Sequence, residues 1–545
     1  MRLAIKLFAK LIESTNRQFH KALENPRLAQ KKVQKKILTN LIKSEYGRYL
    51  RVKTIDDWHR IPIIEYRNIE NWIHTQNKDK THLLTSEPVI FYEKTSGSRG
   101  AAKLIPYTKS FRHSFNQMFC VWAHDLIIHG PKFNTGKIYY CISPQLGNSQ
   151  QEKIQKNSLT KTSHSKLIQD DSEYLDGCLK WIMSQFFISP SGLNKLHDPE
   201  IFKHQLAQAL LISEDLEIIS IWSPTFLKVI LDYIQNNRKQ LAFELVDKMS
   251  AKRRLILLQP HLFTQVSTNN KLNEIFQTTN RDKIPWKLLW SELKLISCWD
   301  SVNAADGADF LRSLFPNVLV QGKGLLATEA PMTIPLIPAK GSVPLLNEVF
   351  FEFLDESGFI YQLHELKQGK IYEMIISQKG GLYRYRIGDR VRFTHLYLNT
   401  PCLEFMGRHK EVSDLVGEKL HSEFVRDVLE TLPLEGTCFK TLVPVKYPKE
   451  HYILLLDTAK QDPKEIALKL EEGLQKSHHY SRARLLKQLE NVRVMVSSQI
   501  PEILSLHQAS AGKKWGDLKH DILSTKSIEK DLLVQLEQVC LIRNY

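Results

Sequence analysis

Hydrophobic positions along the chain follow two different periods. Apolar residues recur at helical spacing over residues 1–50, with a break at Asn25–Pro26, and again over 109–128 and most of 225–290. Between these stretches lie short apolar runs rich in β-branched and aromatic residues, which predict buried strands. These runs are PVIFYEK (88–94), KIYYCIS (137–143), LEIISIWSP (216–224) and LKLISCWDS (293–301). Strands that alternate with helices predict an α/β fold with partly parallel sheets.

The pattern changes in the last 200 residues. Three β-rich runs stand at 349–355, 370–377 and 390–398, and a new strand–helix–strand pattern starts after about residue 405. We therefore predict a large N-terminal domain, residues 1–404, of mixed and partly parallel sheets with flanking helices. A small mobile α+β domain, residues 405–545, follows a hinge before Gly407–Arg408.

The N-terminus, MRLAIKLFAKLIEST, begins with a basic residue, but Lys6 and Lys10 interrupt its apolar stretch, which argues against a secretory signal. Its spacing fits an amphipathic helix that is docked on the protein or, less commonly, lies on a membrane surface. No run of 18 apolar residues occurs, so we expect no transmembrane segment. Residues 144–172 are polar and weakly patterned, as in a loop or insertion.

The amino-acid composition narrows the class of protein. Hydrophobic residues make up 42% and charged residues 25%, which are values of a globular protein. The net charge of +16 fits a basic surface or an anionic substrate, and no zinc-finger, RRM or KH signature points to nucleic acid. Seven widely spaced cysteines without a CxxC pair disfavour a disulfide framework or metal site and suit a cytoplasmic protein.

The segment TSGSRGAAK (95–103) follows a predicted strand. Its small residues leave backbone N–H groups open to phosphate oxygens, with the hydroxyls of Ser96 and Ser98 and the charge of Lys103 beside them. It is not a Walker A loop, because Ala102 precedes the lysine and Leu104 follows it. An ordinary glycine-rich turn is the simpler interpretation of this segment alone.

Three further segments carry polar groups suited to a nucleotide. Thr328 and Glu329, in LLATEAP (325–331), suit phosphate and Mg²⁺ ligation. Asp389, in GLYRYRIGD (381–389), is expected at a turn between two strands, where a carboxylate can accept both hydroxyls of a ribose. Arg408 and Lys419 follow in FMGRHKEVSDLVGEKLHSEFV (405–425). Taken singly, each of these segments could also be an ordinary turn or surface segment without a role in ligand binding.

In this order the four segments resemble the acyl-adenylate-forming superfamily of luciferases, acyl-CoA ligases and peptide-synthetase adenylation domains. The chain is more similar to the Gretchen Hagen type acyl acid–amido synthetases, the auxin-responsive promoter family, in their bacterial form. The similarity spans roughly residues 35–430. It rests on residues 46–73 (YGRYLRVKTIDDWHRIPIIEYRNIENWI), on residues 293–336 around LLATEAP, and on GLYRYRIGD.

The resemblance implies a role for each candidate residue. Thr328 and Glu329 would ligate phosphate and Mg²⁺, with Glu329 also counted as catalytic, and Asp389 would hold the ribose. Arg408 would reach phosphate or ribose, and Lys419 would act beside the acyl carboxylate. The triphosphate would be bound by Ser96, Gly97, Ser98, Gly100 and Lys103.

Three departures from the family pattern stand out. Arg99 takes a place where a hydroxyl residue is usual, and Ala330–Pro331 follow the Thr–Glu pair. Residues 507–520, HQASAGKKWGDLKH, only approximate the family's Lys–x–Pro–Arg-like ending.

The implied reaction has two steps: a carboxylic acid attacks ATP to give acyl-AMP, and an amine or amino acid then takes the acyl group to form an amide. Two alternatives stay open, transfer to a thiol of CoA or of a carrier protein, and a degenerate non-catalytic nucleotide-binding protein. We expect Lys103, Glu329, Asp389 and Arg408 to line one cleft between the two domains. Lys419 would lie further off if the small domain has its second-step orientation.

Overall fold

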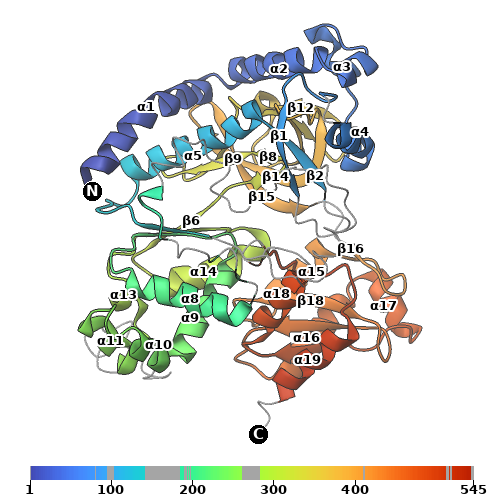
Figure 1. Ribbon diagram of the computed structural model, residues 1–545. Coiled ribbons are helices and arrows are strands. Elements are labelled where there is room, and N and C mark those ends of the chain that lie inside the picture. The colour runs from blue at the N-terminus through green and yellow to red at the C-terminus, as the bar shows by residue number, and fades with distance from the viewer. Residues whose placement is uncertain are drawn as a thin grey trace. The chain divides into compact units, whose positions relative to one another are not determined.

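A computed structural model describes residues 2–79, 82–94, 103–141, 184–188, 193, 196, 198–260, 283–408, 412–510, 515 and 518–541. Its contacts divide the chain into two compact units, and each is described by itself. Unit 1 comprises Met1–Ile142, Asn148–Phe187 and Gln321–His409. Unit 2 comprises Ser143–Gly147, Ile188–Val320 and Lys410–Tyr545. Elements are labelled as in Figure 1.

The main sheet of unit 1 has five antiparallel strands in the order β12-β11-β13-β14-β15. Along β14 buried residues alternate with more exposed ones from Tyr385 to Phe393, as expected where one face of a sheet packs on a core. The strands are β11 (Phe350–Leu354), β12 (Ile360–Gln362), β13 (Ile371–Ser377), β14 (Tyr385–Tyr397) and β15 (Thr400–Arg408). These strands confirm the three β-rich runs of the sequence.

A second strand pair leads into the long helix α5. Strands β1 (Val89–Lys94) and β2 (Leu104–Thr108) are antiparallel, and α5 (Lys109–His129) begins directly after β2. The Thr108 hydroxyl accepts a hydrogen bond from the Phe111 N–H and caps the helix. Strand β2 is not among the predicted strands. Short elements complete the unit: β3 (Ile138–Tyr140), β7 (Leu326–Ala327), β8 (Ala330–Pro331), β9 (Thr333–Leu336), β10 (Gly341–Pro344) and η6 (Leu363–Glu365).

The N-terminal helices follow one another along the outside of unit 1 (Figure 1). Helix α1 (Arg2–Glu24) packs against α5 and buries Ile5, Phe8 and Ile12. The chain then breaks at Asn25, as predicted, before α2 (Pro26–Ile42). The remaining elements are α3 (Glu45–Tyr49), η1 (Ile55–Arg60) and α4 (Tyr66–Asp79).

Gln30 attaches α2 to the main sheet. Its side-chain amide is buried and donates to the carbonyls of Leu346 (2.7 Å) and Val349 (2.8 Å). Its oxygen accepts from the Phe351 N–H at 2.8 Å. One side chain therefore satisfies three buried backbone groups at the start of β11.

In unit 2, strands β4 (Ile218–Ser220) and β5 (Leu295–Cys298) pair in parallel, and the Leu319 N–H at the start of β6 (Leu319–Gly322) donates to the Lys294 carbonyl. Helices pack around them, as the alternating pattern predicts. They are α8 (Pro199–Ile212), α9 (Pro224–Asn236), α10 (Arg238–Glu244), α11 (Ala251–Leu258), α13 (Trp286–Leu289), η5 (Val302–Ala304) and α14 (Ala305–Leu314).

The C-terminal part of unit 2 contains a three-stranded sheet, β18-β19-β20, with helices on both faces. Strand alternation divides its core: Leu442, Leu454 and Leu456 face one hydrophobic cluster, whereas Val443 and Ile453 face another. The three strands are β18 (Lys440–Val445), β19 (His451–Leu456) and β20 (Arg493–Val496), and a separate antiparallel pair, β16 (Val412–Ser413) and β17 (Leu420–His421), precedes them in the chain. The helices are α15 (Ser422–Glu430), α16 (Pro463–Leu474), α17 (His478–Leu485), α18 (Ile500–Ser510) and α19 (Lys530–Leu541).

The two parts of unit 2 share buried side chains. The Trp515 ring centroid lies 5.8 Å from those of Phe202 and Phe226, and Lys203 forms an ion pair with Glu502. The two units are defined by contacts within the chain, whereas the sequence predicts a domain that moves as a body. The predicted division between residues 404 and 405 therefore stays a prediction. No helix among the described residues has the length and apolarity needed to cross a membrane.

We expect Gln30→Ala to lower the free energy of unfolding by about 2–4 kcal/mol, because three buried backbone groups lose their partner. Urea denaturation followed by circular dichroism measures the change. Gln34→Ala, on a half-exposed position of the same helix, is the matched control and should stay near the wild type. Equal midpoints for the two variants would contradict the role of Gln30.

Candidate active site

Lys103 lies at the centre of a cluster of polar groups in unit 1. Its Nζ donates to the Tyr385 hydroxyl at 3.1 Å and lies 5.6 Å and 5.9 Å from the ring centroids of Tyr66 and Tyr385. The Glu329 carboxylate is 3.9 Å away. Lys103 directly precedes β2, whose first N–H, from Leu104, donates to the Tyr66 hydroxyl at 2.8 Å. Two aromatic rings and one carboxylate thus define the position of this ammonium group.

Thr328 and Glu329 form the two-residue turn of the β7–β8 hairpin. The Tyr107 hydroxyl donates to the Thr328 carbonyl at 2.8 Å and fixes this turn on the strand that follows Lys103. Only 6% of Glu329 is exposed. The hairpin therefore holds a buried carboxylate beside a lysine.

Asp389 lies inside strand β14, so the predicted turn at this residue is wrong. Glu373 pairs with Arg390 and Ile375 with Arg386, so that Met374 of β13 faces three residues, Ile387 to Asp389. The middle one, Gly388, has a φ of 86°, which a residue with a Cβ adopts only at a cost. A β-bulge, not a hairpin turn, therefore sets the direction of the Asp389 side chain.

Asp389 pairs with Arg408 across β14 and β15. The two residues are opposite each other in the register, and Arg408 Nε donates to Asp389 Oδ1 at 2.6 Å. Asp389 is 4% exposed, whereas 39% of the Arg408 side chain is exposed. The carboxylate is therefore fixed by a charge-assisted bond, and its arginine partner is open to solvent.

Tyr385 lies between the two ion pairs of the cluster, Lys103 with Glu329 and Asp389 with Arg408. Burial raises the pKa of its phenol, and the neighbouring Glu329 carboxylate raises it further, whereas the Arg408 guanidinium lowers it. Burial likewise raises the pKa of Tyr66. Both phenols are neutral at physiological pH, so they orient Lys103 without cancelling its charge.

The other arginines of GLYRYRIGD form ion pairs within unit 1. Arg384 is buried and binds both oxygens of Glu352 at 2.9 Å and 3.0 Å. Arg386 binds both oxygens of Glu373 at 2.6 Å. Alternation along a strand could point both side chains to solvent, but each is held by its carboxylate partner. Arg384 in particular is a structural residue.

The described cluster does not include the remaining candidate residues. Ser96, Gly97, Ser98 and Gly100, together with Arg99, lie outside the described residues. Lys419 belongs to unit 2, where it is exposed and has a positive φ of 44°. The preceding Glu418 is fully buried and accepts from the Leu415 and Val416 N–H groups and from the Tyr452 hydroxyl. Glu418 thus holds the turn, and the turn presents Lys419 on the surface.

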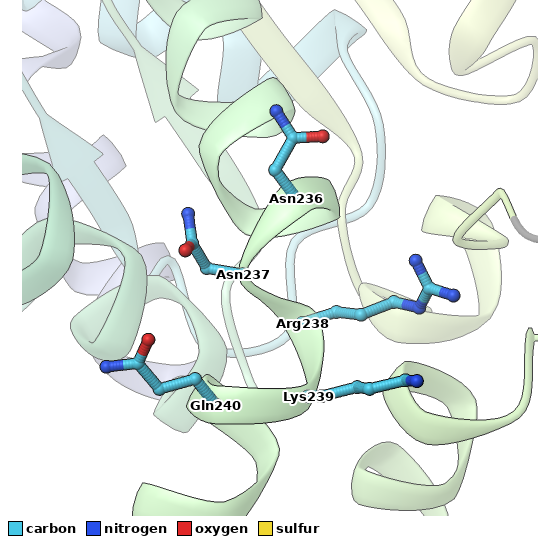
Figure 2. A pocket seen from close by; sticks show the side chains of 5 residues that line it. All are labelled: Asn236, Asn237, Arg238, Lys239 and Gln240. Atoms are coloured by element: carbon cyan, nitrogen blue, oxygen red, sulfur yellow. The ribbon is translucent and has the colours of Figure 1, made fainter.

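A pocket of about 400 Å³ in unit 2 has a different character. It is lined by Asn236, Asn237, Arg238, Lys239 and Gln240, at the junction of α9 and α10. Figure 2 shows Arg238 and Lys239 pointing to one side and Asn237 and Gln240 to the other. The side chains do not converge, so this pocket is a weaker candidate than the Lys103 cluster.

Sequence reasoning missed Tyr66 and Tyr385 as parts of the site. Tyr385 is four residues before Asp389 on a strand, and strand alternation would have placed both on one face. No local signal marks Tyr66, whose role depends on tertiary pairing.

Three family models match consecutive parts of the chain. The GH3 family N-terminal domain matches residues 15–320, the central domain residues 342–408, and the C-terminal domain residues 422–528. The chain belongs to the GH3 family. This confirms the resemblance to the Gretchen Hagen type proteins.

Relatives and solved structures agree with this membership. The GH3 chain is 21% identical to the indole-3-acetic acid-amido synthetase GH3.4 of Arabidopsis thaliana over 88% of its own length and 86% of that protein. It is 22% identical to the indole-3-acetic acid-amido synthetase GH3.2 of the same plant, over 84% of this chain and 91% of that one.

The fold extends to a broader group of enzymes. The acyl acid amido synthetase AtGH3.15, solved in complex with 2,4-DB, matches with a TM-score of 0.75 at 19% identity, over 97% of this chain and 96% of that one. A 2-hydroxyisobutyryl-CoA ligase in its postadenylation state with 2-HIB-AMP matches with a TM-score of 0.52 at 11% identity, over 95% and 92%. The predicted α/β fold of adenylate-forming enzymes and the predicted class, an acyl acid–amido synthetase and hence a ligase, are confirmed.

We expect Tyr385→Phe to raise the ATP KM or lower kcat by about tenfold in total, because Lys103 loses a hydrogen-bond acceptor worth roughly 1–2 kcal/mol. The ring remains, so the fold should be unchanged. ATP–pyrophosphate exchange measures the effect. Tyr361→Phe, which removes a hydroxyl bonded to Asp355 on the β11–β12 hairpin, is the matched control. Wild-type exchange by Tyr385→Phe would contradict a role for the phenol.

Proposed function

We propose that the Lys103 cluster binds ATP and that the enzyme activates a carboxylic acid as acyl-AMP, then transfers the acyl group to an amino acid. The observation that supports this most directly is the meeting of Lys103, Glu329, Asp389 and Arg408 around Tyr385. These residues come from three segments, the first of which lies more than 200 residues before the other two, and two of the four are buried carboxylates. Buried charges kept in pairs are typical of a site that binds charged ligands.

In the first step, a carboxylate oxygen of the acid attacks the α-phosphorus of ATP, and pyrophosphate leaves. Lys103 and Arg408 supply positive charge for the phosphate oxygens. Asp389, already oriented by Arg408 on one oxygen, has further lone pairs that accept the ribose hydroxyls. The work of the protein is to position the reactants and stabilise charge.

We assign Glu329 to holding a divalent cation. A buried carboxylate next to a triphosphate repels it unless a cation lies between them. Among the described residues no group of three acidic, histidine or cysteine side chains forms a complete metal cage. Glu329 therefore fits Mg²⁺, which protein sites often hold through one carboxylate together with substrate phosphates. Bound there, Mg²⁺ would neutralise phosphate charge.

We assign Lys419, on its exposed turn in unit 2, to the first step, where it would stabilise the charge on the acyl carboxylate during adenylation.

In the second step, the amine nitrogen attacks the acyl carbon, the bond to the AMP oxygen breaks, and the nitrogen loses a proton to solvent or a base. An amino acid acceptor is supported by the curated amido synthetases among the relatives. Transfer to a CoA thiol is the second candidate, because a CoA ligase shares the fold.

One experiment tests both the activation and the acceptor. ATP–pyrophosphate exchange across a panel of carboxylic acids should reveal acid-dependent exchange. Amino acids or CoA are then added with the active acid, and mass spectrometry identifies an amide or a thioester. No exchange with any acid, despite ATP binding, would favour a non-catalytic nucleotide-binding protein.

We expect Asp389→Ala to raise the ATP KM by about a hundredfold or more, because two hydrogen bonds to a charged group are lost, each worth roughly 1.5–3 kcal/mol. The melting temperature should change little relative to that of Arg392→Ala, a residue of the same strand whose side chain is 41% exposed. Unchanged ATP kinetics in Asp389→Ala would show that the carboxylate does not contact the nucleotide.

We expect Lys419→Ala to slow pyrophosphate exchange by about a hundredfold, the typical cost of removing one charge-stabilising group from a transition state. Its stability should equal that of the wild type, because the side chain is exposed. Lys464→Ala, an exposed lysine of the same part of unit 2, is the control. Exchange at the wild-type rate would leave Lys419 without a role in the first step.

A further inference from the structure

The segment that contains the first two helices, residues 2–43, holds more than half of the net charge of the chain. Residues 2–43 contain eleven lysines and arginines and two glutamates, a net charge of +9 out of +16. Helix α2 has no acidic residue at all. Its basic side chains at positions 27, 31, 32, 35 and 36 are all exposed. They surround Leu28, which is itself 55% exposed.

Helix α1 carries a row of exposed leucines. Leu3, Leu7 and Leu11 are 70%, 60% and 62% exposed and follow one another at four-residue spacing, so they lie in one line along the helix. Lys6 and Lys10 are exposed beside this line. The opposite face, with Ile5, Phe8 and Ile12, is buried in unit 1. The helix thus has two apolar faces, and the protein covers one of them.

We infer that the exposed face of α1 and α2 docks on the surface of an anionic lipid bilayer. Leucines enter the boundary between headgroups and acyl chains, while lysines on both sides meet the lipid phosphates. The helices lie on the membrane and do not cross it, because no described helix has the length and apolarity to span one. Figure 1 shows α1 and α2 in succession along the outside of unit 1, so both can meet one surface.

The charge and the exposed leucines together argue against the other two kinds of partner, a second copy of the chain and a nucleic acid. A second copy would bring two surfaces of the same net charge of +9 together, and like charges oppose that contact. Nucleic acid would satisfy the lysines, but a phosphate backbone gives three aligned leucines nothing apolar to enter. An anionic bilayer satisfies both features at once.

The test is vesicle flotation with the full-length protein. Vesicles of phosphatidylcholine alone are compared with vesicles of phosphatidylcholine and phosphatidylglycerol, at low and at physiological salt. We expect binding to the mixed vesicles and much weaker binding to the neutral ones. Rising salt should weaken it, because screening acts on exposed charges.

Two variants separate the contributions of charge and leucine. Replacing Lys31, Lys32, Lys35 and Lys36 with glutamine should weaken binding on the order of a hundredfold at low salt. Replacing Leu3, Leu7 and Leu11 with glutamine should weaken it by about tenfold or more at every salt concentration. Exposed residues of α16, α17 and their flanks supply matched controls: one replaces Lys464, Lys469, Lys476 and Lys487, and the other replaces Leu468, Leu485 and Leu486.

Each outcome bears on the inference. All variants should keep solution ATP–pyrophosphate exchange, because none of these residues belongs to the Lys103 cluster, so loss of docking is distinguishable from loss of activity. No binding of the wild type to mixed vesicles would overturn the inference, as would equal binding by site and control variants. A dimer or a DNA complex that the same substitutions abolish, without vesicle binding, would also overturn it and identify the other partner.

Discussion

The buried ion pair between Arg384 and Glu352 holds the candidate site together. The guanidinium binds both carboxylate oxygens of Glu352 and donates to the Ile61 carbonyl at 2.9 Å. Arg384 has a positive φ of 46°, and its N–H donates to the Ser377 hydroxyl at 2.8 Å. Such a backbone conformation costs about 1–3 kcal/mol and persists only where surrounding bonds fix it. A buried ion pair adds little net stability, but it specifies one arrangement.

That arrangement joins the N-terminal segment to the main sheet. The Ile64 N–H donates to the Arg384 carbonyl, and the Arg386 N–H donates to the Ile64 carbonyl, so residue 64 pairs in parallel with the start of β14. Tyr66 follows two residues later and opens α4. It therefore lies where its ring and that of Tyr385 both face Lys103. Loss of Arg384 would therefore affect the placement of Tyr66 and Tyr385 together.

Local sequence patterns predicted most elements, and the family resemblance led to Lys103, Glu329, Asp389 and Arg408. Asn25–Pro26 ends α1, and the apolar runs at 349–355 and 370–377 are β11 and β13. The errors occur where pairing between distant segments decides the structure. Asp389 was expected at a turn because Gly388 precedes it, yet β13 and β15 on either side keep it in a strand and convert the glycine into a bulge. Nothing within ten residues of Tyr66 indicates Tyr385.

The same distinction applies to the net charge of +16. A basic cleft for anionic substrates was one explanation of that charge. In unit 1, however, the basic residues near the motifs have carboxylates beside them: Lys103 has Glu329, Arg408 has Asp389, and Arg384 has Glu352. Local charge there is close to balanced, so a nucleotide must be recognised by short, directed contacts and not by a long-range field.

Much of the excess positive charge lies instead on α1 and α2, where Glu13 and Glu24 are the only acidic residues. Recognition at the site and attraction at the surface are therefore carried by different parts of this chain.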